Sequence, residues 1–227
     1  MTIVLTNDDG IDAPGIQALR NALYGRESII VAPNAPLSGC SHQINRGGPI
    51  EIEKRVEGAY AIAGTPADCT RVALSHLCSE AEWVLSGINA GGNLGADIYV
   101  SGTVAAVREA TLLRTPGIAI SHYIQRGKAI DWDVATQLTT SVLSKLMRLP
   151  IEEGAFWNVN LPHLEPEDPE PAIVFCPCCT QPLPTEYVLE GSQFKYVGEY
   201  DQRLRDPGAD VDVCLSGKIS VVQIRLW

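Results

Sequence analysis

The stretch Thr2-Ile3-Val4-Leu5-Thr6-Asn7-Asp8-Asp9-Gly10 decides the fold of this chain. Residues 2–5 form a short, mostly apolar run rich in β-branched side chains, and the run stops in Asn-Asp-Asp-Gly. This pattern predicts a buried strand that ends in a polar loop. Pro14 follows at a position that suits the first turn of a helix, so the segment predicts a strand, a loop and a helix in that order.

The same alternation continues along most of the chain. Strands are expected at residues 28–32, 83–85, 117–121 and 157–160. Helices are expected from Pro14, after a cap at Thr65, after a cap at Ser101, and over residues 131–148. Strands that alternate with helices predict an α/β fold, with a mostly parallel sheet flanked by helices and joined by right-handed crossovers.

The character of the sequence changes at about residue 165. Proline becomes frequent there, and the β-rich segments 172–175 and 219–226 occur without clear helices. We therefore expect a core over residues 1–164 and a Pro-rich, β-rich extended arm over residues 165–227. The arm is expected to form a hairpin and a terminal strand, and to make contacts between subunits.

The composition excludes several classes of protein. The formal net charge of −10 argues against duplex nucleic acid as a partner, because a polyanion requires a basic surface. No apolar run approaches the roughly 20 residues of a membrane-spanning helix, and the first residues lack the basic segment of a signal peptide. We therefore expect a cytoplasmic protein that contacts no membrane.

The seven cysteines are expected to be reduced thiols in that compartment. Three of them form the cluster Cys176, Cys178 and Cys179. A structural zinc site would need a fourth ligand at a suitable spacing, and no second CxxC or paired histidine occurs. Free thiols, or an occasional disulfide, are therefore favoured over zinc.

Polar segments follow four predicted strands or their loops, at residues 7–10, 38–39, 86–89 and 121–122. Because ligands of an open α/β sheet collect at the carboxyl ends of its strands, we expect these segments to converge. The loop over residues 34–49 is long and rich in Pro, Gly, Ser and Asn, which is typical of functional or mobile loops.

Asp8 and Asp9 are the candidate catalytic residues and metal ligands. As neighbours in a strand they would point to opposite faces, but Gly10 permits a turn that brings both to one point. Two carboxylates about 4 Å apart repel by roughly 4 kcal/mol at an effective dielectric of 20, and a divalent cation reverses that repulsion. Oxygen ligands suit Mg²⁺, Mn²⁺ or Ca²⁺, although an isolated Asp-Asp-Gly is more often an ordinary turn.

Other polar residues complete the candidate site. Asn89 offers a carbonyl oxygen and Ser38 a hydroxyl to a metal ion, with turn formation as the alternative for each. Ser101-Gly102-Thr103 begins a predicted helix and could cradle a phosphate, with plain helix capping as the alternative. His42 and His122 are candidate acid–base groups without an assigned role.

The motifs together resemble the SurE survival-protein family of 5′/3′-nucleotidases. They occur in family order over about the first 120 residues, and six in that order are a specific combination. The motifs are Thr6-Asn7-Asp8-Asp9-Gly10-Ile11, Val31-Ala32-Pro33 with Ser38-Gly39, Gly64-Thr65-Pro66-Ala67-Asp68-Cys69, Ser86-Gly87-Ile88-Asn89, Gly92-Asn93-Leu94-Gly95 and Ser101-Gly102-Thr103-Val104-Ala105-Ala106. The tail is similar to the family more loosely, through residues 158–162 and 217–220.

The resemblance implies a Rossmann-like core, phosphatase activity on nucleoside monophosphates or other small phosphate esters, and dimers or tetramers built with the arm. It implies one divalent cation per subunit, Mg²⁺ or Mn²⁺. Carried over by matching motif, the metal ligands are Asp8, Asp9, Ser38 and Asn89, and the phosphate-binding residues are Asn93, Ser101, Gly102 and Thr103.

Some positions depart from the family pattern. Residues 34–37 are less polar than usual, residues 90–92 lack the arginine or proline often found there, and the late Thr-Asp element is Ala209-Asp210. The metal ligands are untouched, so the departures concern substrate preference and the arm. We expect recognition of the base to depend on residues 34–49 and on neighbouring subunits.

The expected mechanism is metal-assisted hydrolysis by an activated water, with Asp8 or Asp9 as proton acceptor. One alternative is a covalent aspartyl-phosphate route, as in haloacid-dehalogenase-like phosphatases, but Gly10 stands where that route requires a second acid. Another alternative is a nucleotide-binding or stress-sensing module without turnover.

Overall fold

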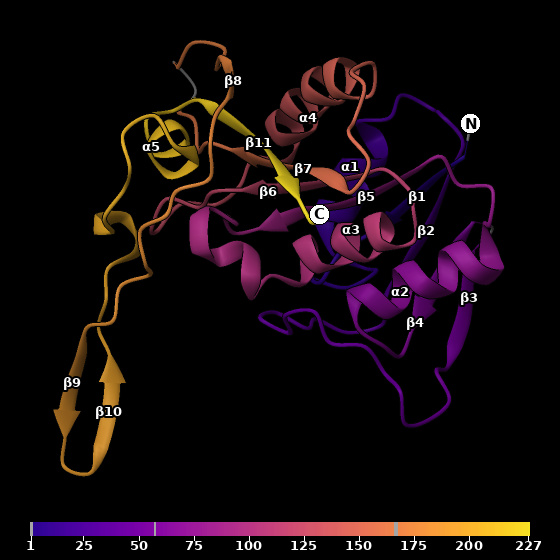
Figure 1. Cartoon of the computed structure of the whole chain (residues 1–227), viewed down its shortest axis with the longest axis horizontal. Coiled ribbons are helices and arrows are strands. Elements are labelled where there is room, and N and C mark those ends of the chain that lie inside the picture. Colours follow the sequence, from indigo (N-terminus) through magenta and orange to yellow (C-terminus); the bar gives the residue numbers. More distant parts are fainter. Residues whose placement is uncertain (1, 57, 166–167) are drawn as a thin grey trace.

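A nine-stranded, mostly parallel sheet organises the chain (Figure 1). The computed structural model describes residues 2–56, 58–165 and 168–227. The strand order is β3-β4-β2-β1-β5-β6-β7-β11-β8. The strands are β1 (Ile3–Thr6), β2 (Ser28–Pro33), β3 (Ile52–Val56), β4 (Ala59–Ile62), β5 (Trp83–Ala90), β6 (Gly117–His122), β7 (Ala155–Leu161), β8 (Ile173–Phe175) and β11 (Ile219–Arg225).

The six strands from β4 to β7 in this order run parallel to one another, whereas β3 is antiparallel to β4 and β11 is antiparallel to β7. The predicted α/β fold with a mostly parallel sheet is confirmed. In β1, at the centre, Ile3, Val4 and Leu5 are fully buried. A strand covered on both faces needs apolar residues at every position, which explains the unbroken run that opens the sequence.

Helices cover both faces of the sheet (Figure 1). The core on one face includes α1 (Pro14–Asn21) and α4 (Trp132–Leu146), while α2 (Pro66–Val72) and α3 (Gly102–Leu112) pack together on the other face. A π-helical turn (Ala73–Leu77) extends α2, and a 3-10 helix, η2 (Gly95–Tyr99), precedes α3.

The predicted helix starts are confirmed by their caps. Pro14 is the first residue of α1. The Thr65 hydroxyl accepts a hydrogen bond from the Asp68 amide and the Asp68 carboxylate accepts one from the Thr65 amide, which forms a capping box. The Ser101 hydroxyl accepts a hydrogen bond from the amide of Val104 and caps α3.

The segment predicted as an arm contains two different parts. β8 and β11 belong to the main sheet, so the segment after residue 164 adds two strands to that sheet. The hairpin of β9 (Tyr187–Glu190) and β10 (Gln193–Tyr196) forms a separate two-stranded sheet that projects from the rest of the chain (Figure 1). The β-rich extended arm is therefore present, and its projecting part is the hairpin.

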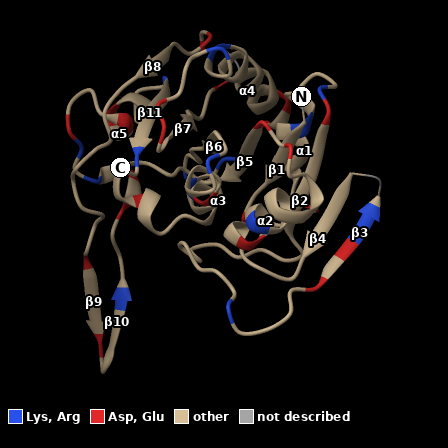
Figure 2. Ribbon diagram, turned by 45° about the vertical axis from the view of Figure 1, so that its right-hand side comes forward, with Lys and Arg blue, Asp and Glu red and all other residues tan. Residues whose placement is uncertain are grey.

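Helix α5 (Asp210–Leu215) and strands β3 and β4 are among the elements that were not predicted from the sequence. The helix has only six residues, too few to show a helical repeat of apolar side chains. β3 and β4 lie at one edge of the sheet, and every side chain of β3 is exposed. β3 carries charges of both signs (Figure 2), which obscure a strand pattern and protect an edge strand from pairing with other chains.

Two further observations bear on partners. Lys and Arg residues are scattered over the fold (Figure 2), so the cations of this acidic chain do not gather over one element. Across residues 2–56, 58–165 and 168–227, no helix combines the length and the apolar character that a membrane crossing requires.

Candidate active site

The candidate site lies where the order of the strands reverses. The chain passes from β1 to β2 on one side, and later returns to β5, which pairs with the other side of β1. Such a reversal leaves a crevice at the carboxyl ends of the two central strands. Residues 7–10 leave β1 at this point, and Asn89 lies near the end of β5. The predicted convergence of polar segments is therefore found at the switch point of the sheet.

Asp8 lies at the bottom of this site, with 5% of its surface exposed. Its Oδ1 accepts a hydrogen bond of 2.5 Å from the Thr103 hydroxyl. Burial raises the pKa of the Asp8 carboxyl above its ordinary value, the Thr103 hydrogen bond opposes the rise, and the charge of nearby Asp9 adds to it. The carboxylate is thus held in an environment that a bound cation would stabilise.

Asp9 is fixed against the end of β5. Its Oδ2 accepts a hydrogen bond of 3.1 Å from the backbone amide of Ala90. The side-chain amide of the neighbouring Asn89 donates a hydrogen bond to the carbonyl oxygen of Gly91 at 2.7 Å. The Oδ1 of Asn89 therefore points away from Gly91. The carboxylate of Asp9 and the carbonyl oxygen of Asn89 are therefore presented by adjacent backbone segments.

The loop that carries Ser38 packs against the other side of the same turn. The amide of Leu37 donates to the carbonyl oxygen of Asp8 at 2.8 Å, which places Ser38 next to the end of β1. Gly10 has a φ of +99°, and a Cβ atom there would lie 3.5 Å from the backbone of Ala35 and Pro36. The left-handed conformation of Gly10 thus allows the chain to turn directly after the two aspartates and brings the loop close.

Three contacts tether the middle of this loop, residues 34–49, to α2 and α3. His42 contacts the buried carboxylate of Glu109 at 2.8 Å, which also accepts a hydrogen bond from Arg71 at 3.0 Å. The amide of Asn45 donates to Asp68 at 2.9 Å. The third contact is the bond from the Thr65 hydroxyl to the Gln43 carbonyl oxygen, at 2.7 Å. The loop is therefore held by side chains of the helices.

The start of α3 closes the site beside Asp8. A Cβ atom at Gly102 would lie 2.8 Å from the Asp8 Oδ2 and from the Cys40 Sγ, so a side chain there would displace the carboxylate. The Ser101 hydroxyl serves as the helix cap and the Thr103 hydroxyl binds Asp8. The donors left for a phosphate are the backbone amides of the first turn, which have no partner within a helix.

Asn93 belongs to a buried amide network. Its backbone amide donates to the Asn160 Oδ1 at 2.7 Å, and its side chain donates to the Ser121 hydroxyl at 2.7 Å. Its carbonyl oxygen accepts hydrogen bonds from Asn158 at 2.8 Å and Asn160 at 3.1 Å. In this structure Asn93 holds the glycine-rich loop against β6 and β7.

Ser121 was expected at this edge of the sheet from the sequence, but no role was assigned to Asn158 and Asn160. Asn158 and Asn160 are two residues apart on β7, so they point to the same face of the strand. Two amides at that spacing within a fully buried strand are the signal that could have found them. Asp210, noted only as a departure from the family pattern, is buried and accepts hydrogen bonds from the amides of Gly95 and Cys179, both at 2.8 Å.

The two candidate acid–base histidines both have structural partners. His42 contacts Glu109. The Nδ1 of His122 donates to the carbonyl oxygen of Tyr123 at 2.8 Å, which leaves Nε2 as the acceptor of the neutral ring. Burial lowers the pKa of His122 to about 4, so this ring is neutral at neutral pH.

The donor chemistry of the site fits a hard divalent cation. Among the described residues, no group of three or more His, Cys, Asp and Glu side chains could hold a metal ion. The candidate site instead combines the carboxylates of Asp8 and Asp9 with the neutral oxygens of Ser38 and Asn89. An all-oxygen set of this kind suits Mg²⁺, Mn²⁺ or Ca²⁺ and not a soft, thiolate-preferring ion.

Comparisons with known proteins agree on one family. The family model described as "Survival protein SurE" matches residues 3–181. A curated protein of Nostoc sp. is 54% identical over 226 residues, which cover 100% of both chains. The "5'-nucleotidase SurE" of Clostridium beijerinckii is 40% identical over 196 residues, which cover 83% of this chain and 77% of that one. A crystal structure of the SurE protein from Aquifex aeolicus has a TM-score of 0.88 and 30% identity, over 99% of this chain and 93% of that one.

Proposed function

This chain belongs to the SurE survival-protein family, and we propose that it hydrolyses nucleoside monophosphates to nucleoside and phosphate at the carboxyl end of β1. The observation that carries this proposal is the arrangement of Asp8 and Asp9. The first is buried against Thr103, the second is held by the backbone of β5, and both lie at the switch point of the sheet. Relatives named as 5'-nucleotidases support the choice of substrate class.

Four side chains would hold a divalent cation in this site. Asp8 and Asp9 supply charge, and Ser38 and Asn89 supply neutral oxygens. We propose one Mg²⁺ or Mn²⁺ ion per subunit. When bound, such an ion lowers the pKa of a coordinated water and neutralises charge on a phosphoryl oxygen.

The residues of the chain then supply position and proton transfer. The Thr103 hydroxyl fixes Oδ1 of Asp8, so the second carboxylate oxygen is directed toward the space beside Gly102. Asp8 or Asp9 accepts the proton of the attacking water, because both carry acceptor oxygens at the strand end. The first-turn amides of α3, at Gly102 and Thr103, bind the phosphoryl oxygens and stabilise the charge that develops on them.

The two alternative functions are less well supported. A covalent aspartyl-phosphate route needs an acid two residues after the nucleophile, where this chain has Gly10. A module that only binds nucleotides has no use for two carboxylates facing one point, since they would repel the phosphate of the ligand.

We also propose that the enzyme is a homodimer or homotetramer in the cytoplasm. The side chains of Tyr187, Leu189 and Phe194 on the projecting hairpin are exposed, and apolar surface of this kind favours contact with a second subunit. All seven cysteines are free, which fits a reducing compartment.

Phosphate release from purified protein tests the proposal. We expect release from AMP, GMP and p-nitrophenyl phosphate with Mn²⁺ or Mg²⁺, and none after chelation of the metal. Asp8→Asn removes one charged metal ligand and should lower the rate by a factor of about 100 to 1000, as loss of a group central to charge stabilisation does. Asp12→Asn, which changes an exposed acid nearby, is the matched control and should keep its activity.

Three results would contradict the proposal. Activity of Asp8→Asn close to the wild-type value would refute the assignment of the site. Nucleotide binding without metal-dependent phosphate release would favour the binding module. A borohydride-sensitive acyl phosphate on Asp8 would favour the covalent route.

A further inference from the structure

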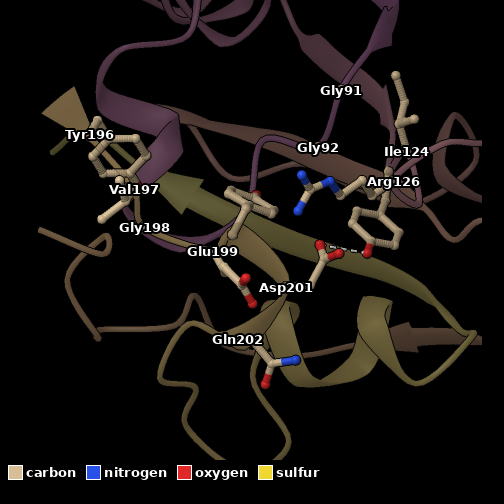
Figure 3. A pocket seen from close by; sticks show the side chains of 12 residues that line it. Gly91, Gly92, Ile124, Arg126, Tyr196, Val197, Gly198, Glu199, Asp201 and Gln202 are labelled. Atoms are coloured by element: carbon tan, nitrogen blue, oxygen red, sulfur yellow. Dashed lines mark hydrogen bonds between the residues drawn. The ribbon is translucent and has the colours of Figure 1, made fainter. Parts of the chain in front are cut away.

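A pocket lies at the root of the arm, and the glycines between Asn89 and Asn93 form part of its wall (Figure 3). Its volume is about 790 Å³, within the range of cavities that hold small organic ligands. It is bounded on one side by the segment that follows β5 and on the other by the segment that follows β10. The lining residues are Gly91, Gly92, Tyr123, Ile124, Arg126, Tyr196, Val197, Gly198, Glu199, Tyr200, Asp201 and Gln202.

The pocket adjoins the residues proposed for metal and phosphate. Asn89 donates its side-chain amide to the carbonyl oxygen of Gly91, which lines the pocket. Gly92 also lines it and directly precedes Asn93. A Cβ atom at Gly92 would lie 3.6 Å from the Tyr200 hydroxyl, so the glycine-rich segment packs close to a tyrosine that lines the pocket. A nucleoside linked to a phosphate at the proposed metal site, next to Asn89, would therefore lie close to this pocket.

Hydrogen bonds hold the walls of the pocket in place. The Tyr123 hydroxyl donates to Asp201 at 2.8 Å, which joins the end of β6 to the root of the arm (Figure 3). The Tyr200 hydroxyl donates to Asp97, and the buried Arg203 contacts the same carboxylate at 2.9 Å. The pocket is thus largely formed before any ligand enters.

Arg126 supplies a positively charged group to the lining of this pocket. It is exposed and makes no ion pair with any residue in the described part of the chain. Figure 3 shows its guanidinium group extending toward the space between Gly92 and Asp201. A guanidinium group beside tyrosine rings is suited to a flat, polar, aromatic ligand, on which it stacks and to whose acceptors it donates. The carboxylate of Glu199 can accept hydrogen bonds from sugar hydroxyls.

We propose that this pocket binds the nucleoside part of the substrate, and that Arg126 is a specificity-determining residue within it. The proposal rests on the proposed nucleotidase function, because the nucleoside is the leaving group of that reaction and this pocket is proposed as its binding site. A second pocket, of about 540 Å³, borders the Ser38 loop where base recognition was expected from the sequence. Among the described residues, its lining contains no aromatic ring and no positively charged side chain. It therefore has fewer groups that could stack on a nucleotide base or donate hydrogen bonds to it.

Kinetic specificity provides the first test. The ratio of kcat/KM for GMP or AMP to kcat/KM for p-nitrophenyl phosphate is measured with Mn²⁺ for the wild type, Arg126→Ala and Arg148→Ala. The ratio should fall about tenfold in Arg126→Ala, the loss expected for one good contact. Arg148 is also exposed but follows α4 and does not line this pocket, so Arg148→Ala should keep the wild-type ratio.

Binding of a nucleoside without phosphate provides the second test and does not depend on turnover. Guanosine and adenosine are titrated into each protein by calorimetry, and Arg126→Ala should bind them about tenfold more weakly than the wild type. Nucleoside binding that depends on Arg126, without any phosphate release, would support the nucleoside site and refute the proposed nucleotidase activity. Arg126→Ala could instead hydrolyse the substrates normally, with the wild-type kcat/KM ratio and the wild-type affinity for nucleosides. That result would refute nucleoside binding by Arg126 in this pocket and would leave the proposed nucleotidase function intact.

Discussion

The turn after β1 and the β9–β10 hairpin differ in how deeply they are buried and in which contacts hold them in place. At the turn, Asp8 is 5% exposed and its position is fixed by contacts from α3 and from the Ser38 loop. On the hairpin, Phe194 is 74% exposed, and each of the eight strand residues is open to solvent. The first region is held by distant parts of the sequence, whereas the second is held by its own short ladder of strand pairs.

This difference matches a division between the residues that we propose for catalysis and those that we propose for binding other molecules. Asp8 and Thr103, which we propose to act in metal and phosphate binding, are buried at the carboxyl end of β1 and the start of α3, where their positions are fixed. The residues that we propose to contact a second subunit or a nucleoside lie on the arm and at its root. Changes at the catalytic edge should therefore reduce stability and turnover, whereas changes on the hairpin should affect association alone.

The largest effect on stability is expected from the titration of His122 at the catalytic edge. Burial lowers its pKa from 6.5 to about 4, so between these values the unfolded chain binds a proton that the folded chain does not. The free energy of unfolding should thus fall as the pH is lowered from 6.5 to 4, by up to about 3 kcal/mol, and the loss is complete below pH 4. Denaturant unfolding over this pH range measures the slope.

His122→Asn isolates the contribution of this side chain, since an amide can still donate to the carbonyl oxygen of Tyr123 but does not titrate. The wild type should lose more stability than the variant between pH 6.5 and 4. His163, whose ring lies 6.1 Å from that of His122, is kept in both proteins. Parallel pH profiles would show that the buried ring is not the group that titrates.

A smaller effect is expected when the tether on Asp8 is removed. Thr103→Val keeps the shape of the side chain but removes the hydroxyl that donates to Asp8. Loss of a group that orients a metal ligand typically costs 10- to 100-fold, so kcat/KM should fall by about that factor and the apparent affinity for Mn²⁺ should weaken with it. Steady-state kinetics over a Mn²⁺ series measures both.

Thr103→Ser is the matched control, because it restores a hydroxyl at the same position. It should recover most of the lost Mn²⁺ affinity. Equal losses in both variants would show that the methyl group, and not the hydrogen bond, matters at this position.

The smallest effect on stability is expected on the hairpin. Phe194→Ser should change the free energy of unfolding by less than about 0.5 kcal/mol, because an exposed side chain loses little on replacement. The same variant should elute as a smaller species in size-exclusion chromatography if the hairpin joins subunits. A loss above about 1 kcal/mol at a concentration where the wild type is monomeric would show that the hairpin packs against the core.

Much of the core could be predicted because its signals are local. The apolar run before Asn7, the capping box at Thr65 and the cap at Ser101 each report on neighbouring residues, and all three mark real element boundaries. The convergence of the strand ends followed from the parallel order of the sheet. These features depend on the backbone and on burial, which the sequence pattern expresses directly.

The remaining features depend on contacts between residues far apart in the sequence. Thr103 lies 95 residues from Asp8, so its hydrogen bond could not be expected, and it was interpreted only as a phosphate contact. Asn93 was likewise assigned to phosphate, although its side chain is bonded to Ser121. The pocket at the root of the arm combines segments that follow β5, β6 and β10, and no local pattern brings these together.

Manganese binding tests the central claim, that the end of β1 holds a divalent metal ion, most directly. Electron paramagnetic resonance of free Mn²⁺ during a titration reports binding whether or not turnover occurs. The wild type should bind one ion per chain, and the double variant Asp8→Asn with Asp9→Asn should lose that site while its circular dichroism spectrum stays the same. A double variant that binds Mn²⁺ as tightly as the wild type would contradict the account.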